Sequence, residues 1–264
     1  MKQLLLATTA VVALGAAAQA ADMPVKAPPI APVHYSWTGC YIGGNAGINQ
    51  NRSSFDWGFD PLFPDTAAFI AGRRAGAQAT LRSTGFTGGV GAGCNLQEGP
   101  WVWGVEADFQ AHTGNTSRFQ DLVPFGLPAG NTVTESFSTR WLATARVRAG
   151  FAVTERTLLY ATGGVAFMNV NFHDHTNYPA AANDGSITET RAGWVVGAGL
   201  EYALGLNWSG KIEYLHAGFG TTSFTTQAMT VPGGVPVANA FLTHNHTLST
   251  DIVRVGLNYR FGSY

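Results

Sequence analysis

The sequence predicts an all-β fold, an eight-stranded antiparallel transmembrane β-barrel with short periplasmic turns and long extracellular loops. Apolar and polar residues alternate with period two in eight segments, which is the pattern of strands with one apolar face. Tight turns and long polar connections follow one another, an asymmetry typical of outer-membrane barrels. Charged residues make up 12% of the chain, where about 25% is usual.

Residues 1–20 are predicted to be a secretory signal peptide. Lys2 supplies a positive start, residues 4–18 form an apolar run, and Ala18-Gln19-Ala20 has the small-x-small pattern that signal peptidase accepts. A membrane-anchoring helix is the alternative, but the run is shorter than the ~20 residues that a span needs. No other apolar run approaches that length.

Residues 21–36 are predicted to be a proline-rich periplasmic linker, and residues 37–264 the barrel. The linker holds four prolines, which fix φ and lack the N–H that a sheet interior requires. We therefore expect an extended, polyproline-like conformation there. An even number of strands places both ends of the barrel in the periplasm.

Eight segments carry the alternation, and their connections differ in length. In 253–261, for example, Val253 and Val255 lie on one face and Arg254 on the other. The predicted strands are 37–49, 84–97, 101–111, 141–151, 157–169, 192–202, 208–216 and 253–261. Neither face of 157–169 is clearly polar, so that strand is ambiguous. The tight turns are 97–100, 152–156 and 203–207; the long connections are 50–83, 112–136, 170–189 and 217–247.

The distribution of charge favours a barrel over a soluble β-sandwich, which also alternates. Complementary charges lie on the polar faces of separate strands, whereas the apolar faces end in Trp, Tyr or Phe, as interfacial aromatic girdles require. Lipid cannot hydrogen-bond a free strand edge, so the sheet must close. The predicted interior charge network consists of Glu106, Asp108, Arg146, Arg148, Glu201, Lys211, Glu213, Arg254 and Arg260.

These interior charges have two interpretations. An eight-stranded barrel is just wide enough for its side chains to fill, and charges removed from water must pair. An ion-paired plug is therefore favoured. The alternative is a selectivity filter that lines a pore.

Seven stretches carry a family resemblance: Trp37-Thr-Gly-Cys-Tyr-Ile-Gly-Gly-Asn45, Phe86-Thr-Gly-Gly-Val90, Gly104-Val-Glu-Ala-Asp108, Tyr160-Ala-Thr-Gly-Gly164, Gly197-Ala-Gly-Leu-Glu-Tyr202, Lys211-Ile-Glu-Tyr-Leu215 and Val253-Arg-Val-Gly-Leu-Asn-Tyr-Arg-Phe261. In their order and spacing they resemble the alphaproteobacterial outer-membrane β-barrel proteins of the Brucella 25/31-kDa outer-membrane antigen type, often labelled porin-like. The resemblance covers nearly all of the predicted mature chain. It implies a bacterial outer-membrane location, with lipopolysaccharide and the barrel-assembly machinery as partners; a homo-oligomer stays open.

Cys40 and Cys94 depart from the family, which usually carries aromatic residues at these positions. Both fall on the predicted lipid face, near the periplasmic ends of neighbouring strands. The hypothesis is a cross-strand disulfide, which an exported chain can keep and which requires Cα atoms within about 7 Å. The alternative is two free thiols that behave as apolar side chains.

Both ends of the predicted mature chain have a counterpart in the family. Family members commonly end in an aromatic residue, which resembles the signal read by the assembly machinery. Here Phe261 is predicted to serve, because alternate positions counted back from it are apolar. At the other end, Ala21 and Asp22 are similar to family termini that become cross-linked to peptidoglycan through the N-terminal amine. The alternative is a frayed periplasmic tail.

The sequence suggests two further kinds of site. His173-Asp-His175 and His244-Asn-His246 each place two imidazoles on one face of an extended segment, where a pair could chelate a transition metal; polar loop residues are the favoured alternative. Ser249 and Asp251 lie near His246, but their spacing on a strand does not build a catalytic triad. The sequence thus predicts no enzyme, no cofactor, and, with a net charge of −1, no nucleic-acid partner.

Three classes of function remain for such a barrel. The leading one is structural: an integral barrel that contributes to envelope integrity, with a tether to the wall. The second is a narrow channel for small solutes. The third is recognition of surfaces or ligands through the predicted loops 50–83 and 217–247.

Overall fold

The computed structural model describes residues 35–62, 65–205 and 207–261. The predicted signal peptide, most of the predicted linker, and the attachment residues Ala21 and Asp22 lie outside the described residues. Within the described part no helix is long and apolar enough to cross a bilayer.

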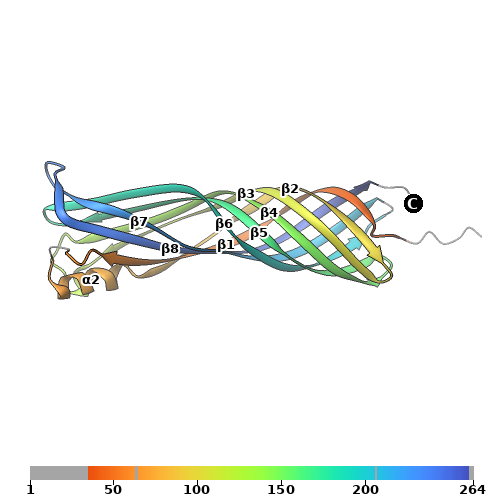
Figure 1. Cartoon of the computed structure of the whole chain (residues 1–264), viewed down its shortest axis with the longest axis horizontal. Helices are drawn as coiled ribbons and strands as arrows, with labels where there is room; N and C mark the ends of the chain where they lie inside the picture. Colours follow the sequence, from red (N-terminus) through yellow and green to blue (C-terminus); the bar gives the residue numbers. More distant parts are fainter. Residues whose placement is uncertain (1–34, 63–64, 206, 262–264) are drawn as a thin grey trace, which may run out of the picture. The chain divides into compact units, whose positions relative to one another are not determined.

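Eight antiparallel strands form a closed ring, as predicted: each strand pairs with the next, and β1 pairs with β8 (Figure 1). The strands are β1 (Gly39–Phe59), β2 (Ala79–Glu98), β3 (Trp101–Asp121), β4 (Thr132–Thr154), β5 (Thr157–Asn177), β6 (Ala181–Ala203), β7 (Trp208–Thr230) and β8 (Pro236–Phe261). Helix α2 (Ala67–Ala77) and the short 3₁₀ helix η1 (Val123–Phe125) lie in two connections. The ambiguous segment 157–169 is part of β5.

The predicted long loops are wrong in extent, because the strands continue well into them. Residues 50–59 extend β1, 112–121 extend β3, 170–177 extend β5 and 217–230 extend β7. The connections left at that end are 60–78, 122–131, 178–180 and 231–235. The tight turns at the other end are close to their predicted places. The barrel is therefore much longer than the expected membrane-spanning strands.

The extension escaped prediction because the apolar residues change faces part-way along each strand. In β5, Phe167 points outward and is 42% exposed, whereas the next apolar residues, Met168, Val170 and Phe172, point inward and are fully buried. The outward residues beyond Phe167 are Asn169 and Asn171. A search for outward apolar residues therefore stops at this boundary, although the strand does not.

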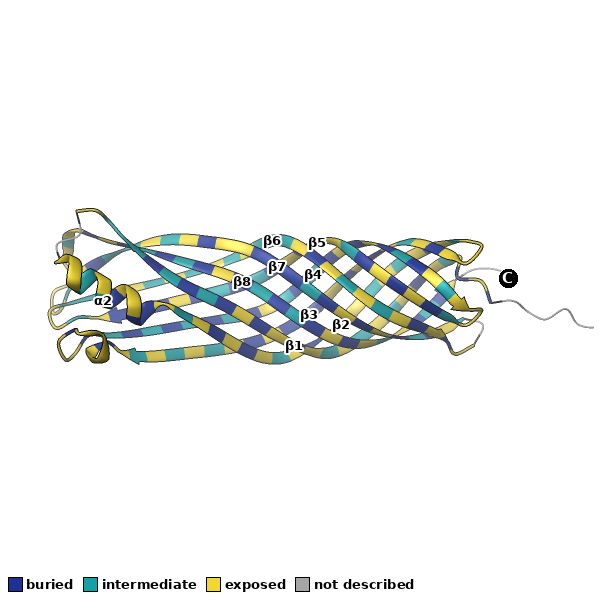
Figure 2. Ribbon diagram, turned by 90° about the horizontal axis from the view of Figure 1, so that it is seen from below, coloured by how far each residue is buried: buried dark blue, intermediate teal, exposed yellow. Residues whose placement is uncertain are grey.

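The two halves of the barrel are defined by this change. The membrane half comprises 40–48, 86–96, 101–111, 141–153, 159–167, 192–202, 208–214 and 253–261, where outward residues are apolar. The upper half comprises the parts of the strands above it: 49–59, 79–85, 112–121, 132–140, 168–177, 181–191, 215–230 and 236–252. Buried and exposed residues alternate along the strands of both halves (Figure 2). In the upper half the interior is an apolar core that includes Phe55, Leu81, Phe137, Phe172 and Leu248.

Helix α2 packs at the upper end of the barrel, opposite the end where β8 finishes (Figure 1). The Thr66 side chain caps the helix by accepting a hydrogen bond from the Phe69 N–H at 3.3 Å, which satisfies one free donor of the first turn. Ala77 of the helix belongs to a buried cluster with Trp57 and Leu122. Side chains therefore fill this end of the barrel.

Aromatic side chains fill the lower end. Tyr35, the first residue that the structure describes, and Trp37 are 9% and 1% exposed, and their rings meet edge-on with centroids 4.9 Å apart. The Arg260 guanidinium lies 4.2 Å from the centre of the Tyr35 ring. Tyr35 thus belongs with the barrel rather than with an extended linker.

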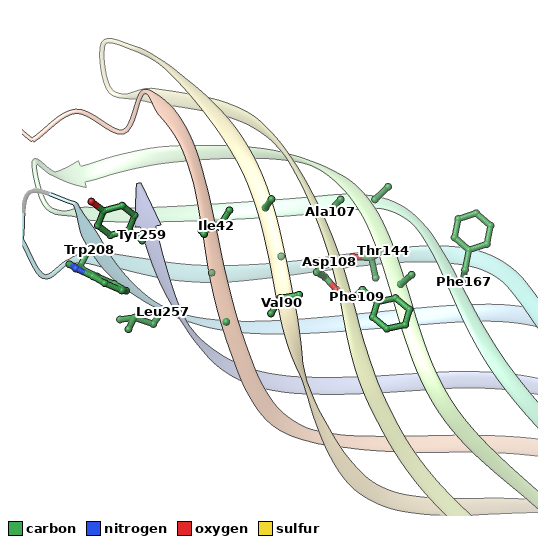
Figure 3. Close-up of a pocket in the computed structure, with 16 residues that line it drawn as sticks. Ile42, Val90, Ala107, Asp108, Phe109, Thr144, Phe167, Trp208, Leu257 and Tyr259 are labelled. Carbon is green, nitrogen blue, oxygen red and sulfur yellow. Dashed lines mark hydrogen bonds between the residues drawn. The ribbon is translucent and has the colours of Figure 1, made fainter. Parts of the chain in front are cut away.

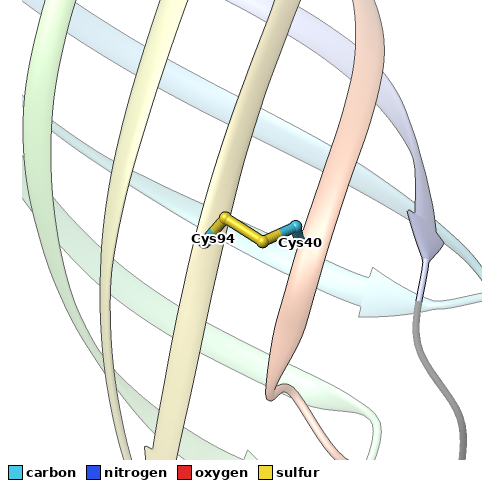
Figure 4. Close-up of a disulfide and its surroundings, with 2 residues drawn as sticks. All are labelled: Cys40 and Cys94. Carbon is cyan, nitrogen blue, oxygen red and sulfur yellow. A yellow bond between two sulfur atoms is a disulfide. The ribbon is translucent and has the colours of Figure 1, made fainter.

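Cys40 and Cys94 form the hypothesised disulfide in the structure (Figure 4). The two residues are direct cross-strand partners on β1 and β2, with Cα atoms 3.9 Å apart. Both are exposed on the outer wall. The bond ties the first two strands together close to the lower end.

The backbone pairing of the wall is interrupted at two places in the upper half: between β2 and β3, where it stops at Thr87 and His112, and between β6 and β7. The paired residues jump from Ala182 to Trp194 on β6. Side chains bridge the interval: Arg191 donates to the Phe219 carbonyl at 2.8 Å, and the Thr222 hydroxyl donates to Glu189 Oε1 at 2.6 Å.

Candidate functional site

The outer wall of the membrane half is apolar. Trp103, Val105 and Phe109 of β3 are 51–58% exposed, a state that costs free energy in water but not in a bilayer. A shallow hollow of about 990 Å³ crosses this wall, lined by Ile42, Val90, Ala107, Phe109 and other residues of β1 to β5, β7 and β8 (Figure 3). Its lining is mostly apolar, and the two polar residues in it, Asp108 and Thr144, are buried and hydrogen-bonded to each other.

Two arginines organise the interior of the membrane half. Arg146 on β4 pairs with Glu106, with Asp108 Oδ2 at 2.7 Å and with Glu213 Oε1 at 3.0 Å. Arg254 on β8 contacts Glu213 Oε2 at 2.6 Å and Asp108 Oδ2 at 3.0 Å. The carboxylates come from β3 and β7, so these bonds cross the barrel as well as joining neighbouring strands.

A second group lies around Arg148, Glu201 and Lys211. Arg148 donates to Glu201 Oε2 at 2.7 Å, and Lys211 Nζ contacts Glu106 Oε2 at 2.9 Å. The Arg148 guanidinium also lies 3.9 Å from the centre of the Tyr160 ring. Glu106 accepts from cations of both groups, which joins them into one network.

The interior charges balance and are buried. Four acids, Glu106, Asp108, Glu201 and Glu213, face four bases, Arg146, Arg148, Lys211 and Arg254. All eight residues are 8% exposed or less. The ninth predicted residue, Arg260, lies over the Tyr35 and Trp37 rings at the lower end. Since charges removed from water are costly unless paired, the arrangement is that of a filled interior.

Sequence reasoning missed the neutral members of the network. The Tyr41 hydroxyl donates to Glu106 Oε2 at 2.6 Å, and the Tyr160 hydroxyl donates to Glu213 Oε1 at 3.1 Å. Ser209 and Asn258 donate to Glu201 Oε1 at 2.6 and 3.0 Å. Each of these residues occupies an inward-facing alternate position of its strand, and this alternation is the sequence signal that could have identified it.

The upper half holds a second buried polar cluster, which the loop prediction concealed. Asp174 Oδ2 contacts His244 Nδ1 at 3.0 Å and His246 Nε2 at 2.9 Å. Those imidazoles hold the pKa of Asp174 below its usual range against the effect of burial. Burial and the nearby Asp174 raise the pKa of Glu135 to about 8, although the Arg118 guanidinium opposes this from 3.5 Å.

The two His-x-His pairs do not converge. His244 and His246 are buried inside the barrel, whereas His173 and His175 are on the outer wall beside Asp184. The pair on β5 occupies outward positions and the pair on β8 occupies inward positions, so the two pairs lie on opposite faces of the sheet. Within residues 35–62, 65–205 and 207–261, no group of three or more metal-ligating side chains is arranged to hold an ion.

Ser249, Asp251 and His246 of β8 are separated by the same alternation of inward and outward positions. His246 points inward, whereas Ser249 and Asp251 lie on the outer face. Asp251 instead contacts His216 Nδ1 at 2.7 Å and accepts from the Tyr214 hydroxyl at 2.6 Å.

A closed ring with a lipid-facing apolar wall and an ion-paired interior defines an integral outer-membrane β-barrel protein. The chain belongs to the outer-membrane β-barrel family, because the family model described as "Outer membrane protein beta-barrel domain" matches residues 6–261. Phe261, the predicted assembly residue, ends β8 on the outer wall at 49% exposure.

Curated relatives support the same family and location. The chain is 35% identical to the 31 kDa outer-membrane immunogenic protein of Brucella melitensis, over 99% of this chain and 100% of the relative. It is 25% identical to the 25 kDa outer-membrane immunogenic protein of Brucella abortus, over 99% of each. The outer membrane protein OprG from Pseudomonas aeruginosa has 13% identity and a TM-score of 0.47, over 87% of this chain and 99% of that one.

Proposed function

We propose that this protein is a structural barrel, without enzymatic activity, that contributes to the integrity of the outer membrane. The observation that carries this proposal is the burial of the paired charges in the membrane half. The side chains that fill both ends of the barrel also support this proposal. A solute channel would need those interior groups to be hydrated.

Single-channel conductance tests whether the barrel is filled. Refolded protein in a planar bilayer is expected to insert without discrete current steps, because the membrane half leaves its charges no water. Insertion is checked in the same preparation by the heat-dependent shift in gel mobility that folded barrels show. Reproducible steps from folded protein would support the narrow channel instead.

Envelope integrity needs a cellular test. A strain that lacks this protein should leak periplasmic enzymes and become sensitive to bile salts, and the wild-type chain should restore both properties. Complementation with a variant that folds but lacks residues 22–34 separates the barrel from its N-terminal segment. A deletion strain with an unaltered envelope would refute the structural role.

We further propose that the mature N-terminus is attached to peptidoglycan. The proposal rests on the resemblance of Ala21 and Asp22 to family termini, and on the reach of the proline-rich segment, about 3.1 Å per residue when extended. Mass spectrometry of muropeptides released by lysozyme should reveal an adduct on the Ala21 amine. If the peptide beginning at Ala21 is recovered only unmodified, the tether is excluded.

A further inference from the structure

The outer wall of the upper half carries arginines close to the apolar belt. Most outward residues there are serine, threonine or asparagine. Arg52 on β1, Arg82 on β2 and Arg140 on β4 are exceptions, and all three are exposed. Arg140 lies where the β4 pairing shifts register, a feature that re-aims a side chain. The wall is therefore positive near this boundary, although the whole chain has a net charge of −1.

Arg52 and Arg82 are direct cross-strand partners. Like charges in that position destabilise a strand pair, so the two residues together call for an anion. Asp251, on the neighbouring strand β8, is engaged by His216 and Tyr214, and Arg52 is the last of the groups that lower its pKa. Among the described residues Arg82 has no ion pair or side-chain hydrogen bond.

The height of the pair matches the polar layer of a bilayer. Ile48 and Phe86 are the last outward apolar residues of β1 and β2, they are register partners, and they are 53% and 75% exposed. Arg52 and Arg82 each lie four residues farther up their strands, after Ile48 on β1 and before Phe86 on β2. At about 3.3 Å per residue and a strand tilt near 45°, the Cα atoms of both arginines lie roughly 9 Å above those of Ile48 and Phe86. The polar layer of each leaflet is about 5–7.5 Å thick, so long arginine side chains reach the lipid headgroups from the outer edge of this layer.

We infer that Arg52 and Arg82 bind a phosphate group of an outer-leaflet glycolipid. Two guanidinium forks on adjacent strands can each donate two parallel hydrogen bonds to phosphate oxygens, and one phosphate between them removes the repulsion within the pair. The inference rests on the proposed function, since a barrel that strengthens the membrane gains by holding the surrounding lipid.

The test measures lipid binding to the folded, full-length mature chain in detergent micelles by native mass spectrometry. The probes are bis-phosphorylated lipid A, the same lipid without its phosphates, and inorganic phosphate as a competitor. The R52Q/R82Q variant is compared with R74Q, because Arg74 is also outward, at 53% side-chain exposure, but has a partner in Asp56 at 3.2 Å. R52K/R82K keeps the positive charges but loses the two parallel hydrogen bonds that each guanidinium group can donate.

We expect bis-phosphorylated lipid A to bind R52Q/R82Q about tenfold more weakly than wild type, as expected for lost charge-assisted hydrogen bonds. R74Q should bind like wild type, R52K/R82K should be intermediate, and the dephosphorylated lipid should not distinguish the four proteins. In phosphate-free micelles R52Q/R82Q should melt no lower than wild type, because the repulsion is gone.

Three results would overturn the inference: unchanged affinity of R52Q/R82Q, an equal loss in R74Q, or displacement of the lipid by inorganic phosphate at similar concentration. The last would assign the site to a free anion. If the double variant fails to fold, the single variant R82Q answers the same question. A negative result in this lipid-binding test does not change the expected conductance or deletion phenotype. It can therefore be distinguished from a failure of the proposed function.

Discussion

Arg146 shows how single residues hold the membrane half together. It reaches Glu106, Asp108 and Glu213 on two other strands, and its side chain is fully buried. A buried ion pair need not be worth more than an apolar replacement, but removal of one partner leaves an uncompensated charge. The stabilising role of the network is therefore revealed by breaking it.

Arg146→Ala should lower the free energy of unfolding by about 3–5 kcal/mol, because three carboxylates lose a shared cation. Urea titration in lipid vesicles, followed by tryptophan fluorescence, measures the change. The control is Arg74→Ala, which breaks a half-exposed pair and should cost under about 1 kcal/mol. Equal, small losses in both variants would argue against an ion-paired plug.

Glu135 predicts how stability depends on pH. Its pKa is raised from 4.5 to about 8 in the folded barrel, so the folded state retains a proton that the unfolded chain releases. The contribution of protonated Glu135 to the free energy of unfolding is fully present below pH 4.5 and is lost as pH rises through about 8. Asp174 acts in the opposite sense at acid pH: its lowered pKa gives stability that disappears as pH falls below its usual value of 3.8.

Glu135→Gln should therefore flatten the fall in unfolding free energy between pH 4.5 and about 8, by at least about 1 kcal/mol. Urea midpoints at a series of pH values provide the measurement. Asp121→Asn, a change at an exposed carboxylate of β3, serves as the control and should leave the slope unchanged. A wild-type slope in the Glu135 variant would place the pH dependence elsewhere.

At the scale of elements, α2 illustrates what the sequence did not disclose. Its segment reads as a polar connection, and its packing depends on two glycines that meet the neighbouring connection. A Cβ on Gly72 would lie 2.5 Å from Leu127 Cδ1, and one on Gly76 would lie 2.3 Å from Leu122 Cδ2. Such contacts are tertiary and leave no periodic signal in a single sequence.

Gly72→Val should detach α2 from the upper end of the barrel, because the added methyl groups have no space beside Leu127 and the Phe125 carbonyl. Hydrogen exchange by mass spectrometry should show faster exchange in 67–77, with the strands of the membrane half unchanged. Ala75→Val, at an exposed position of the same helix, is the control. Protection of α2 equal to wild type would mean that the glycine is not required.

The sequence was informative wherever the outer wall meets lipid. The alternation around Trp103 and Val255 identified strands, their faces, and the charges opposite them, because the bilayer imposes one strict pattern on every strand. Beyond Ile48 and Phe167 the apolar residues face inward and the polar residues, many of them threonines, face outward.

A search for apolar residues on the outer wall therefore assigns these strand segments to loops. The Asp174 cluster was missed for this reason. The Cys40–Cys94 pair was identified because both residues fell on neighbouring strands at one height.

At the scale of the whole molecule, one sheet contains two opposite arrangements of apolar and polar residues. The membrane half turns apolar residues to lipid and pairs its charges inside, whereas the upper half has an apolar core and a polar wall, as a soluble barrel would. The change of solvent along the strands explains the change of faces. The protein is thus a barrel whose lower part spans the membrane and whose upper part stands in water.

Spin labels at two outward positions of β3 examine this division. Val105→Cys lies in the membrane half at 58% exposure in the native chain, and Ser117→Cys lies on the outer wall of the upper half; the native cysteines are bonded to each other. In lipid vesicles, the label at 105 should collide with oxygen and the label at 117 with a water-soluble nickel chelate, both with the restricted motion of an ordered strand. A label at 117 that contacts lipid, or that tumbles freely as in a loop, would contradict the two-part barrel.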